Sequence, residues 1–381
     1  MSASPHRTAL ILSGGGARAA YHAGVLKAVR EMLPDPRHNP FPILCGTSAG
    51  AINAAVIASR AENFGAGVNF LLDFWSRLRA GDVYRADAAG LLYSSVRWLA
   101  LLAAGRLFGG GPRSFLDNAP LRRLLAESID FSGIERAVSG HAVHAVGITC
   151  SGFNSGQSVT FFQGRADLEP WQRGQRVGAH VKLELDHLMA SMAIPFVFPA
   201  VKLHREWFGD GALRQLTPIS PAVHFGADRI LAIDPGPMAA LDADRESTAA
   251  YPSLAQVAGH ALSGIYVDSL SMDLERVVRI NRTLAFLPDE ARRERGVELR
   301  PIEVLTITPS IRFDHLAAEH ENALPWTVRR LLAVVGGRGR EGGAFTSYLL
   351  FEESYIRALI DLGYRDTMAR RDEVAAFLGL A

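Results

Sequence analysis

The chain has 381 residues, of which 48% are hydrophobic and 21% are charged, and its formal net charge is +1. This length is enough to bury a large core, and this composition is typical of a globular enzyme and excludes a disordered chain. Because a nearly neutral chain has no overall field that would attract phosphates, we expect no nucleic-acid partner.

The first 60 residues contain two strand–loop–helix units in series. The apolar run at residues 8–12 predicts a buried strand, and the glycine loop after it leads into an amphipathic helix expected over residues 19–32. A second apolar run at residues 41–45 predicts another strand, followed by a helix that continues to about Arg60. Two such units in series are typical of a parallel α/β sheet.

The rest of the chain adds strands first and helices later. Strands are predicted at residues 142–149, 158–162, 197–203, 229–234 and 302–308, helices at 187–194, 254–281 and 346–362, and a turn at 207–212. We therefore expect a core domain over residues 8–235 and a mainly helical C-terminal extension over residues 236–381, packed on that core.

The sequence also bears on location and on bound metals. The first apolar run is too short for a signal peptide, and the most apolar long stretch, residues 88–108, is interrupted by Arg97 and Arg106, so we expect a cytoplasmic protein without a membrane-spanning helix. Cys45 and Cys150 are expected to be buried free thiols. We predict no cofactor and no metal site, because no acidic cluster has the spacing of a calcium loop.

The pentapeptide at residues 46–50, Gly-Thr-Ser-Ala-Gly, fits the G-x-S-x-G pattern of a nucleophile elbow. Gly46 and Gly50 would leave room for a sharp strand-to-helix turn that exposes the Ser48 hydroxyl, and the following helix N-terminus would favour developing negative charge. The alternative is a glycine-rich turn in which Ser48 only caps the helix.

Two further glycine-rich segments are candidates for the same chemistry. Asp210 precedes Gly211, and this pair could aim a carboxylate into a cleft or form an ordinary Asp-Gly turn. The loop Gly14-Gly15-Gly16 lies between a strand and a helix, where free backbone N–H groups bind anions. A dinucleotide site would need an acidic residue at the end of the second strand. That strand ends at Gly-Thr-Ser, which favours an oxyanion hole instead.

Four segments now stand in a definite order: the loop at residues 14–18, the pentapeptide at 46–50, Ala-Ser-Met-Ala-Ile-Pro at 190–195 and Asp-Gly-Ala at 210–212. In this order they resemble the patatin-like phospholipase family, as found in bacterial lipid acyl hydrolases. The resemblance covers about residues 8–234 and includes residues 115–121, which are similar to a segment that precedes a helix in that family. One departure is Ala19, where the family usually has glycine, and its methyl group could crowd the packing of helix on strand.

The resemblance implies a three-layer α/β sandwich with a mainly parallel central sheet and a catalytic Ser48/Asp210 dyad that needs no histidine. Ser48 would attack the acyl carbonyl and Asp210 would accept its proton. The oxyanion hole would be formed by the loop residues Gly14, Gly15, Gly16 and Arg18, supported by Gly46, Gly50 and Gly211. The expected activity is hydrolysis of lipid esters, as by a phospholipase A, a lysophospholipase or an esterase.

Two other functions stay open on the sequence. An α/β-hydrolase with a Ser-Asp-His triad would draw its histidine from His224, His260, His315 or His320. A silent scaffold that binds lipid is the second alternative. The stretch at residues 91–108 is either an amphipathic lid that docks on a membrane surface or a buried helix. Phe161, Phe162, Phe196 and Phe198 are either core residues or the lining of an acyl-chain channel.

Overall fold

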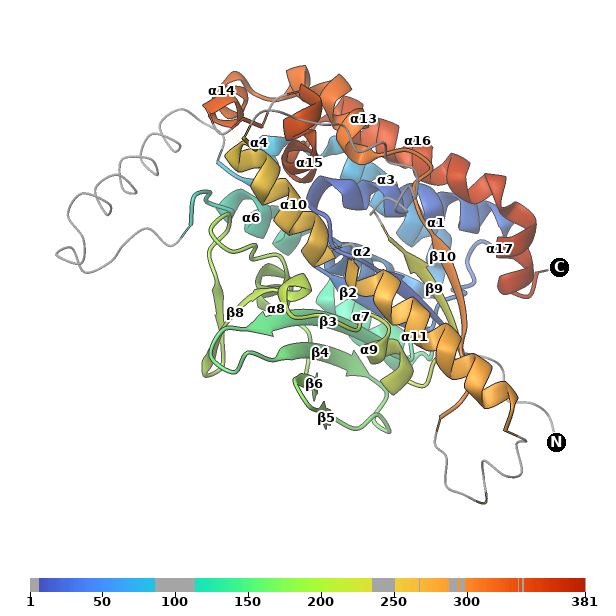
Figure 1. Cartoon of the computed structure of the whole chain (residues 1–381). Helices are drawn as coiled ribbons and strands as arrows, with labels where there is room; N and C mark the ends of the chain where they lie inside the picture. Colours follow the sequence, from blue (N-terminus) through green and yellow to red (C-terminus); the bar gives the residue numbers. More distant parts are fainter. Residues whose placement is uncertain are drawn as a thin grey trace.

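The computed structural model describes residues 7–85, 114–234, 251–266, 268–287, 294, 299–334, 336–337 and 339–380. Within these residues a central sheet lies between two layers of helices, as Figure 1 shows, so the predicted three-layer α/β fold is confirmed. The stretch at residues 91–108, which the sequence offers as a lid, lies outside the described residues.

The sheet of the described residues runs in the order β10-β9-β1-β2-β3-β4-β6-β5, with β8 also paired to β3 and β7 to β8. From β10 to β3 all neighbouring strands are parallel, and antiparallel pairs occur on the other side of β3. The strands are β1 Thr8–Leu12, β2 Ile43–Thr47, β3 Ala145–Gly152, β4 Ser158–Gly164, β5 Trp171–Arg173, β6 Arg176–His180, β7 Val201–Leu203, β8 Glu206–Asp210, β9 Arg229–Ile233 and β10 Glu303–Ile307.

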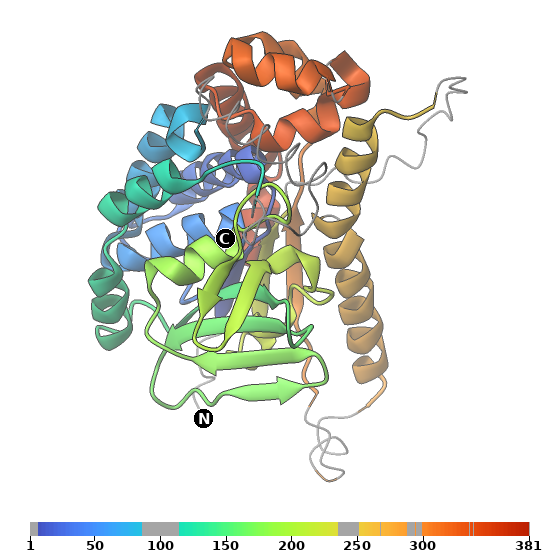
Figure 2. The same cartoon turned by 90° about the vertical axis from the view of Figure 1, so that its left-hand side faces the viewer.

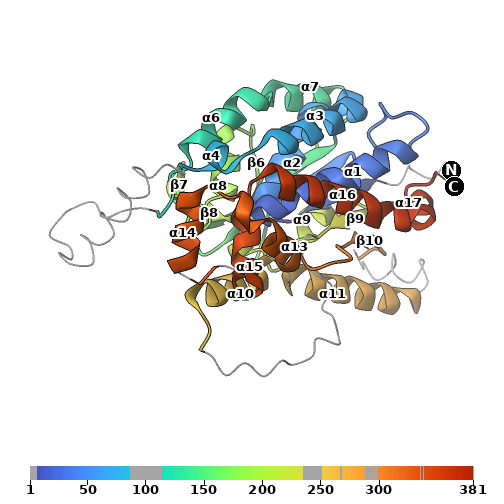
Figure 3. The same cartoon turned by 90° about the horizontal axis from the view of Figure 1, so that it is seen from above.

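Helices cover both faces of this sheet, and Figures 2 and 3 show them on its two sides. The α-helices are α1 Ala20–Met32, α2 Ala49–Ser59, α3 Phe64–Arg77, α4 Ala80–Val83, α6 Ala119–Ser128, α7 Phe131–Ser139, α8 Leu185–Ser191, α9 Ser220–His224, α10 Leu254–Tyr266, α11 Asp268–Ala285, α13 Phe313–His320, α14 Trp326–Val334, α15 Gly339–Leu349, α16 Glu353–Ala369 and α17 Arg371–Phe377. Short 3₁₀ helices are η1 Gly16–Ala19, η2 Ala61–Asn63, η4 Gly211–Leu213 and η5 Glu321–Ala323.

The continuous apolar run of β1 follows from burial of both faces of the sheet. Successive side chains of a strand point to opposite faces. Leu10 and Leu12 therefore enter the core that contains α1, α2 and α3, whereas Ala9 and Ile11 enter a second core that contains α9 and one face of α11. In Figure 3 the first group of helices and the α10–α11 pair lie on opposite sides of the molecule.

Three of the predicted elements are wrong in detail. Only Val201–Leu203 of the strand predicted at 197–203 is a strand, because Pro195 and Pro199 cannot donate ladder hydrogen bonds and Phe196 has a positive φ of 66°. The turn predicted at 207–212 is largely strand β8, which pairs with β3 and β7. The helix predicted at 346–362 is broken between α15 and α16, where Leu350 and Phe351 enter the core.

The part of the chain after residue 235 is built into the same sheet and layers. Strand β10 extends the sheet beside β9, and α16 packs along α1. This helix pair is unusually close, because a Cβ atom at Gly24 would lie 2.0 Å from the carbonyl oxygen of Ile360 and one at Gly363 would lie 2.3 Å from that of Tyr21. Division of the chain at residue 235 remains a prediction.

Among the described residues, no helix has the length and hydropathy that crossing a bilayer requires.

We predict that Gly24→Ala lowers the free energy of unfolding by about 1–3 kcal/mol, because the added methyl group would force α1 and α16 apart. The matched control is Gly81→Ala in α4, where an added Cβ atom would have no neighbouring atom of the described structure within 4 Å. It should be neutral or stabilising by up to about 1 kcal/mol. Urea unfolding of both variants measures this difference. Equal changes in the free energy of unfolding in the two variants would contradict the close contact between α1 and α16.

Candidate active site

Ser48 lies at the junction of β2 and α2, in the strand–turn–helix context that its motif requires. Its backbone has φ 54° and ψ −129°, and its side chain is buried at 2% exposure. No side chain fits on either side of the turn. A Cβ atom at Gly46 would lie 2.6 Å from the Cα atom of Ala51, and one at Gly50 would lie 2.1 Å from the carbonyl oxygen of Leu12.

The Ser48 hydroxyl is not used as a helix cap. Ser48 occupies the N-cap position of α2, but its side chain accepts no capping hydrogen bond from the first turn. The alternative interpretation of the motif, a serine that only caps a helix, is therefore not supported by this geometry. The free N–H groups at the start of α2 provide positive electrostatic potential next to this hydroxyl.

Asp210 ends strand β8 and is 1% exposed. Its carboxylate accepts a hydrogen bond of 3.0 Å from the amide of Ala212, and its own amide donates to the carbonyl oxygen of Ala193 at 2.9 Å. In the sheet Asp210 is paired with Cys150. Cys45 and Cys150 are both buried free thiols, as predicted, and burial together with the charge of Asp210 raises the pKa of Cys150.

The sheet brings the Asp210 turn to the Ser48 turn. Strand β3 pairs with β2 on one side, with Thr149 opposite Thr47, and with β8 on the other. A Cβ atom at Gly211 would lie 2.1 Å from the carbonyl oxygen of Thr149 and 2.9 Å from the Thr47 side chain. Glycine at position 211 thus lets the Asp210 turn pack against the residue that precedes Ser48.

Hydrogen bonds that converge on Thr149 hold the two turns in place. The amide of Ser48 donates to Ser191 Oγ at 2.9 Å, and the Ser191 hydroxyl donates to the carbonyl oxygen of Thr149 at 2.6 Å. On the other side, Thr47 Oγ1 donates to Gln215 Oε1 at 2.5 Å and Gln215 Nε2 donates to Thr149 Oγ1 at 3.3 Å. Ser191 and Gln215 are therefore positioning residues of the candidate site.

The glycine loop lies against the same turn. Gly14 and Gly15 are buried and lead into η1, and Gly16 has φ 56° and lines the cavity over Ser48. A Cβ atom at Gly16 would lie 2.2 Å from the carbonyl oxygen of Tyr348, in α15. The C-terminal helices therefore pack directly on the loop that is predicted to hold the oxyanion.

The side chain of Arg18 points to α15 and not into the cavity over Ser48. Its guanidinium donates to Ser347 Oγ at 2.8 Å, to the Tyr348 hydroxyl at 3.0 Å and to the carbonyl oxygen of Ala344 at 3.2 Å. It also lies 3.9 Å from the centre of the Tyr348 ring, as in a cation–π contact. Through these contacts the Arg18 guanidinium links the glycine loop to α15.

Behind the loop, Ala19 lies next to a buried network of polar side chains. Ala19 is fully buried, and its carbonyl oxygen accepts a hydrogen bond of 3.0 Å from Asn53 Nδ2. Asn53 also contacts His22 Nδ1 at 3.1 Å and accepts from Trp75 Nε1 at 2.8 Å. Burial lowers the pKa of His22 to about 3, so the imidazole is neutral in the folded protein.

Ser48 and Asp210 face two cavities that share Ile194. The cavity over Ser48 is small, with a volume of about 30 Å³. The cavity beside Asp210 is larger, at about 420 Å³, and almost entirely apolar. Among the described residues no histidine lines either cavity. His224 instead stacks on Trp171, with ring centres 4.5 Å apart, and His320 Nδ1 contacts Ser354 Oγ.

The sequence model of the family described as patatin-like phospholipase matches residues 10–223 of this chain. The chain belongs to the patatin-like phospholipase family. The match extends from β1 to α9 and therefore includes the glycine loop, Ser48 and Asp210.

Similar proteins carry the same family name or activity. A patatin-like phospholipase domain-containing protein of Pyricularia oryzae is 48% identical over 62 residues, which are 16% of this chain and 7% of that protein. A cGAMP-activated phospholipase of Pseudomonas aeruginosa is 26% identical over 220 residues, or 56% of this chain and 54% of that protein. This chain thus matches about half the length of the bacterial relative and a small part of the fungal one.

A structure of human GIVD cytosolic phospholipase A2 aligns with 98% of this chain and 58% of its own length, at 16% identity and a TM-score of 0.43. VipD from Legionella pneumophila aligns with 94% of this chain and 67% of its own length, at 12% identity and a TM-score of 0.35. At these scores the likeness carries no argument about function.

We predict that Ser191→Ala lowers kcat for a p-nitrophenyl ester by about 10- to 100-fold with little change in KM. Without the hydroxyl, the buried amide of Ser48 and the carbonyl of Thr149 lose their shared partner, and unfolding free energy should fall by about 1–3 kcal/mol. Ser59→Ala is the matched control, since Ser59 is also buried and bonded to the backbone, at Val56. Loss of kcat in Ser59→Ala as large as in Ser191→Ala would contradict a specific role.

A second prediction concerns acid stability. Because the folded pKa of His22 is about 3 and the unfolded value about 6.5, only the unfolded chain takes up this proton as the pH falls below about 6.5. This histidine therefore lowers the unfolding free energy by up to about 1.4 kcal/mol per pH unit between those values. His22→Gln should show a shallower loss of stability from pH 7 to 4.5 in urea unfolding. Equal slopes for wild type and variant would show that His22 is protonated in the folded chain.

Proposed function

We propose that this protein is a serine hydrolase of lipid carboxylic esters, with Ser48 as nucleophile and Asp210 as general base. The observation that carries the proposal is the meeting of the Ser48 and Asp210 turns across Thr149, in apolar surroundings. Family membership and the phospholipases among its relatives support lipid acyl hydrolysis as the general activity.

The chemistry proceeds in two stages. Ser48 Oγ forms a bond to the acyl carbon while its proton passes to the Asp210 carboxylate. The tetrahedral intermediate then breaks its bond to the alcohol oxygen, which takes the proton from Asp210. In the second stage a water molecule gives a proton to Asp210 while its oxygen bonds to the acyl carbon. The bond between the acyl carbon and Ser48 Oγ then breaks, and Ser48 Oγ takes the proton from Asp210. The products are a free fatty acid and an alcohol, and Ser48 regains its proton.

The surroundings have to compensate for a weak base, since an ordinary aspartate has a pKa of about 3.9. We assign stabilisation of the oxyanion to the amides of Gly15 and Gly16 and to the N-terminus of α2. Gly14 would shape the loop, and Arg18 would act through α15 by holding the loop in position. Because Ser48 and Asp210 are buried, these dipoles act in surroundings of lower dielectric than water, where they are stronger.

The substrate is a lipid or another acyl ester, and contact with a membrane surface is part of the proposal because phospholipids are presented there. The apolar cavity beside Asp210 supports a substrate with a hydrocarbon chain. The Ser-Asp-His alternative gains no support, since no histidine lines the two cavities among the described residues. The other alternative, a scaffold that binds lipid without catalysis, is distinguished from an enzyme by measuring ester hydrolysis.

The direct test is hydrolysis of p-nitrophenyl butyrate and of mixed phospholipid vesicles by wild type, Ser48→Ala and Asp210→Asn. We expect each variant to lose at least about 1,000-fold in kcat, because each removes a group that takes part in bond formation or proton transfer. Thermal unfolding near the wild-type temperature is required to show that both variants fold. Single alanine variants of His224, His260, His315 and His320 should keep activity within about threefold.

A histidine variant that abolishes activity while Asp210→Asn retains it would replace the dyad with a triad. An inert wild-type protein would favour the scaffold.

A further inference from the structure

The cavity beside Asp210 continues away from the catalytic turns into the C-terminal helices. It is bounded by the loop between α8 and β7, by Phe115 and Phe345, and by side chains of α10. Among the described residues that line it, Asp210 is the only charged one, and the other side chains are hydrocarbon. Its volume of about 420 Å³ is within the range of small-molecule sites.

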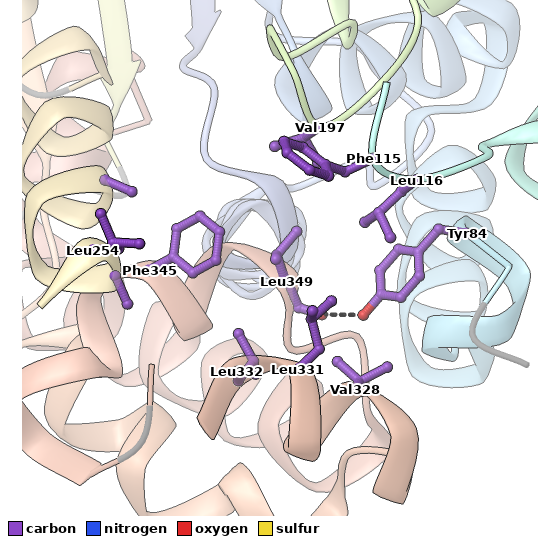
Figure 4. A pocket seen from close by; sticks show the side chains of 12 residues that line it. Tyr84, Phe115, Leu116, Val197, Leu254, Val328, Leu331, Leu332, Phe345 and Leu349 are labelled. Atoms are coloured by element: carbon purple, nitrogen blue, oxygen red, sulfur yellow. Dashed lines mark hydrogen bonds between the residues drawn. The ribbon is translucent and has the colours of Figure 1, made fainter. Parts of the chain in front are cut away.

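A second apolar cavity of about 240 Å³ adjoins the first. The two share Phe115, Val197, Ala258 and Phe345, so that these side chains form common walls. Figure 4 shows that the second cavity is lined by Leu254 of α10, by Phe345 and Leu349 of α15, and by three side chains of α14. Because α10, α14 and α15 all lie beyond residue 223, this part of the cavity is built outside the region that the family model matches.

The two cavities differ in their polar groups: Tyr84 lines the second cavity and Asp210 lines the first. The hydroxyl of Tyr84 is satisfied, since it donates to the carbonyl oxygen of Leu349 at 3.0 Å (Figure 4). Of the described residues that line the two cavities, only Asp210 is charged, and the sheet places it at the end near Ser48. An apolar passage with a reactive carboxylate at one end matches a ligand that has a polar reacting group and a long hydrocarbon tail.

We propose that the acyl chain of the ester substrate lies in these two cavities, and that α10, α14 and α15 set the length of chain that the enzyme accepts. The inference rests on the proposed function, because it places the scissile ester between Ser48 and Asp210. The cavity over Ser48, at about 30 Å³, is much smaller than the cavity beside Asp210, at about 420 Å³. The chain therefore passes Ile194, which both sites share, and runs toward Ala258.

Ala258 is the position at which the passage can be blocked. It lines both cavities and lies on α10, with no role in the dyad or in the hydrogen bonds around Thr149. A tryptophan side chain at 258 would fill the space where the two cavities meet. His260 is two residues away on the same helix, is exposed and lines neither cavity, so His260→Trp is the matched control.

The experiment compares kcat/KM for p-nitrophenyl butyrate, octanoate and laurate, each below its critical micelle concentration. For wild type we expect roughly a fourfold rise per added methylene until the cavities are filled, because each methylene leaves water for an apolar site. Ala258→Trp should remain within about twofold of wild type on butyrate and fall at least about 10-fold on octanoate. His260→Trp should follow wild type on all three esters.

A second variant tests the direction of the chain. Leu331 of α14 lines only the second cavity and is 41% exposed, so Leu331→Trp should fold and should narrow the far end alone. We expect it to lower kcat/KM for laurate at least about fivefold and to leave butyrate and octanoate within about twofold. A chain-length profile that is the same in Ala258→Trp and His260→Trp would overturn the proposed chain site.

Binding separates failure of this inference from failure of the proposed function. Fluorescence titration with cis-parinaric acid on Ser48→Ala, alone and combined with Ala258→Trp or His260→Trp, reports the chain site without turnover. The chain site is supported if cis-parinaric acid binds at least about 10-fold more weakly to Ser48→Ala/Ala258→Trp and with unchanged affinity to Ser48→Ala/His260→Trp. This result would support the site even if the wild-type protein hydrolysed no ester. Absence of hydrolysis would overturn only the proposed function. Equal binding in both combinations overturns the site, whatever the activity.

Discussion

The left-handed backbone at Ser48 is the constraint on which the rest of the site depends. A non-glycine residue at φ 54° costs on the order of 1–3 kcal/mol, and such strain persists only where the surroundings determine it. Here the surroundings are β2 before the turn, α2 after it, close contacts at Gly46 and Gly50, and the hydrogen bond from the Ser48 amide to Ser191. Together they fix the hydroxyl at the end of the sheet to which β8 brings Asp210.

The C-terminal part of the chain contributes to the same construction. Helix α15 contacts the glycine loop at Gly16 and binds the guanidinium of Arg18, while α16 packs along α1 with glycines at the close contacts on both helices. Helix α10 closes the apolar space beside Asp210. Residues after 223 thus contact the glycine loop and line the proposed chain site, although they lie outside the region that the family model matches.

Features with a local physical cause could be predicted from the sequence. Continuous apolar runs gave β1 and β2, and the glycines around Ser48 predicted the strand–turn–helix context that the structure shows. The direction of the Arg18 side chain, the strand character of β8 and the break before α16 depend on partners far away in the chain, which local patterns do not encode. In the sequence, Ser191 stands out only as part of the family segment at residues 190–195, and no pattern points to Gln215. Both residues hold the candidate site through hydrogen bonds between α8, the residues after η4 and the strands, which are far apart in the chain.

The central claim is that Ser48 is the nucleophile and that Asp210 activates it. The most direct measurement is the rate and site of covalent labelling by an alkyl fluorophosphonate, followed by mass spectrometry of the digested protein. The account predicts one adduct per chain, on Ser48, with no adduct in Ser48→Ala and labelling at least about 100-fold slower in Asp210→Asn. Labelling at another residue, or an unchanged rate in a folded Asp210→Asn variant, would contradict it.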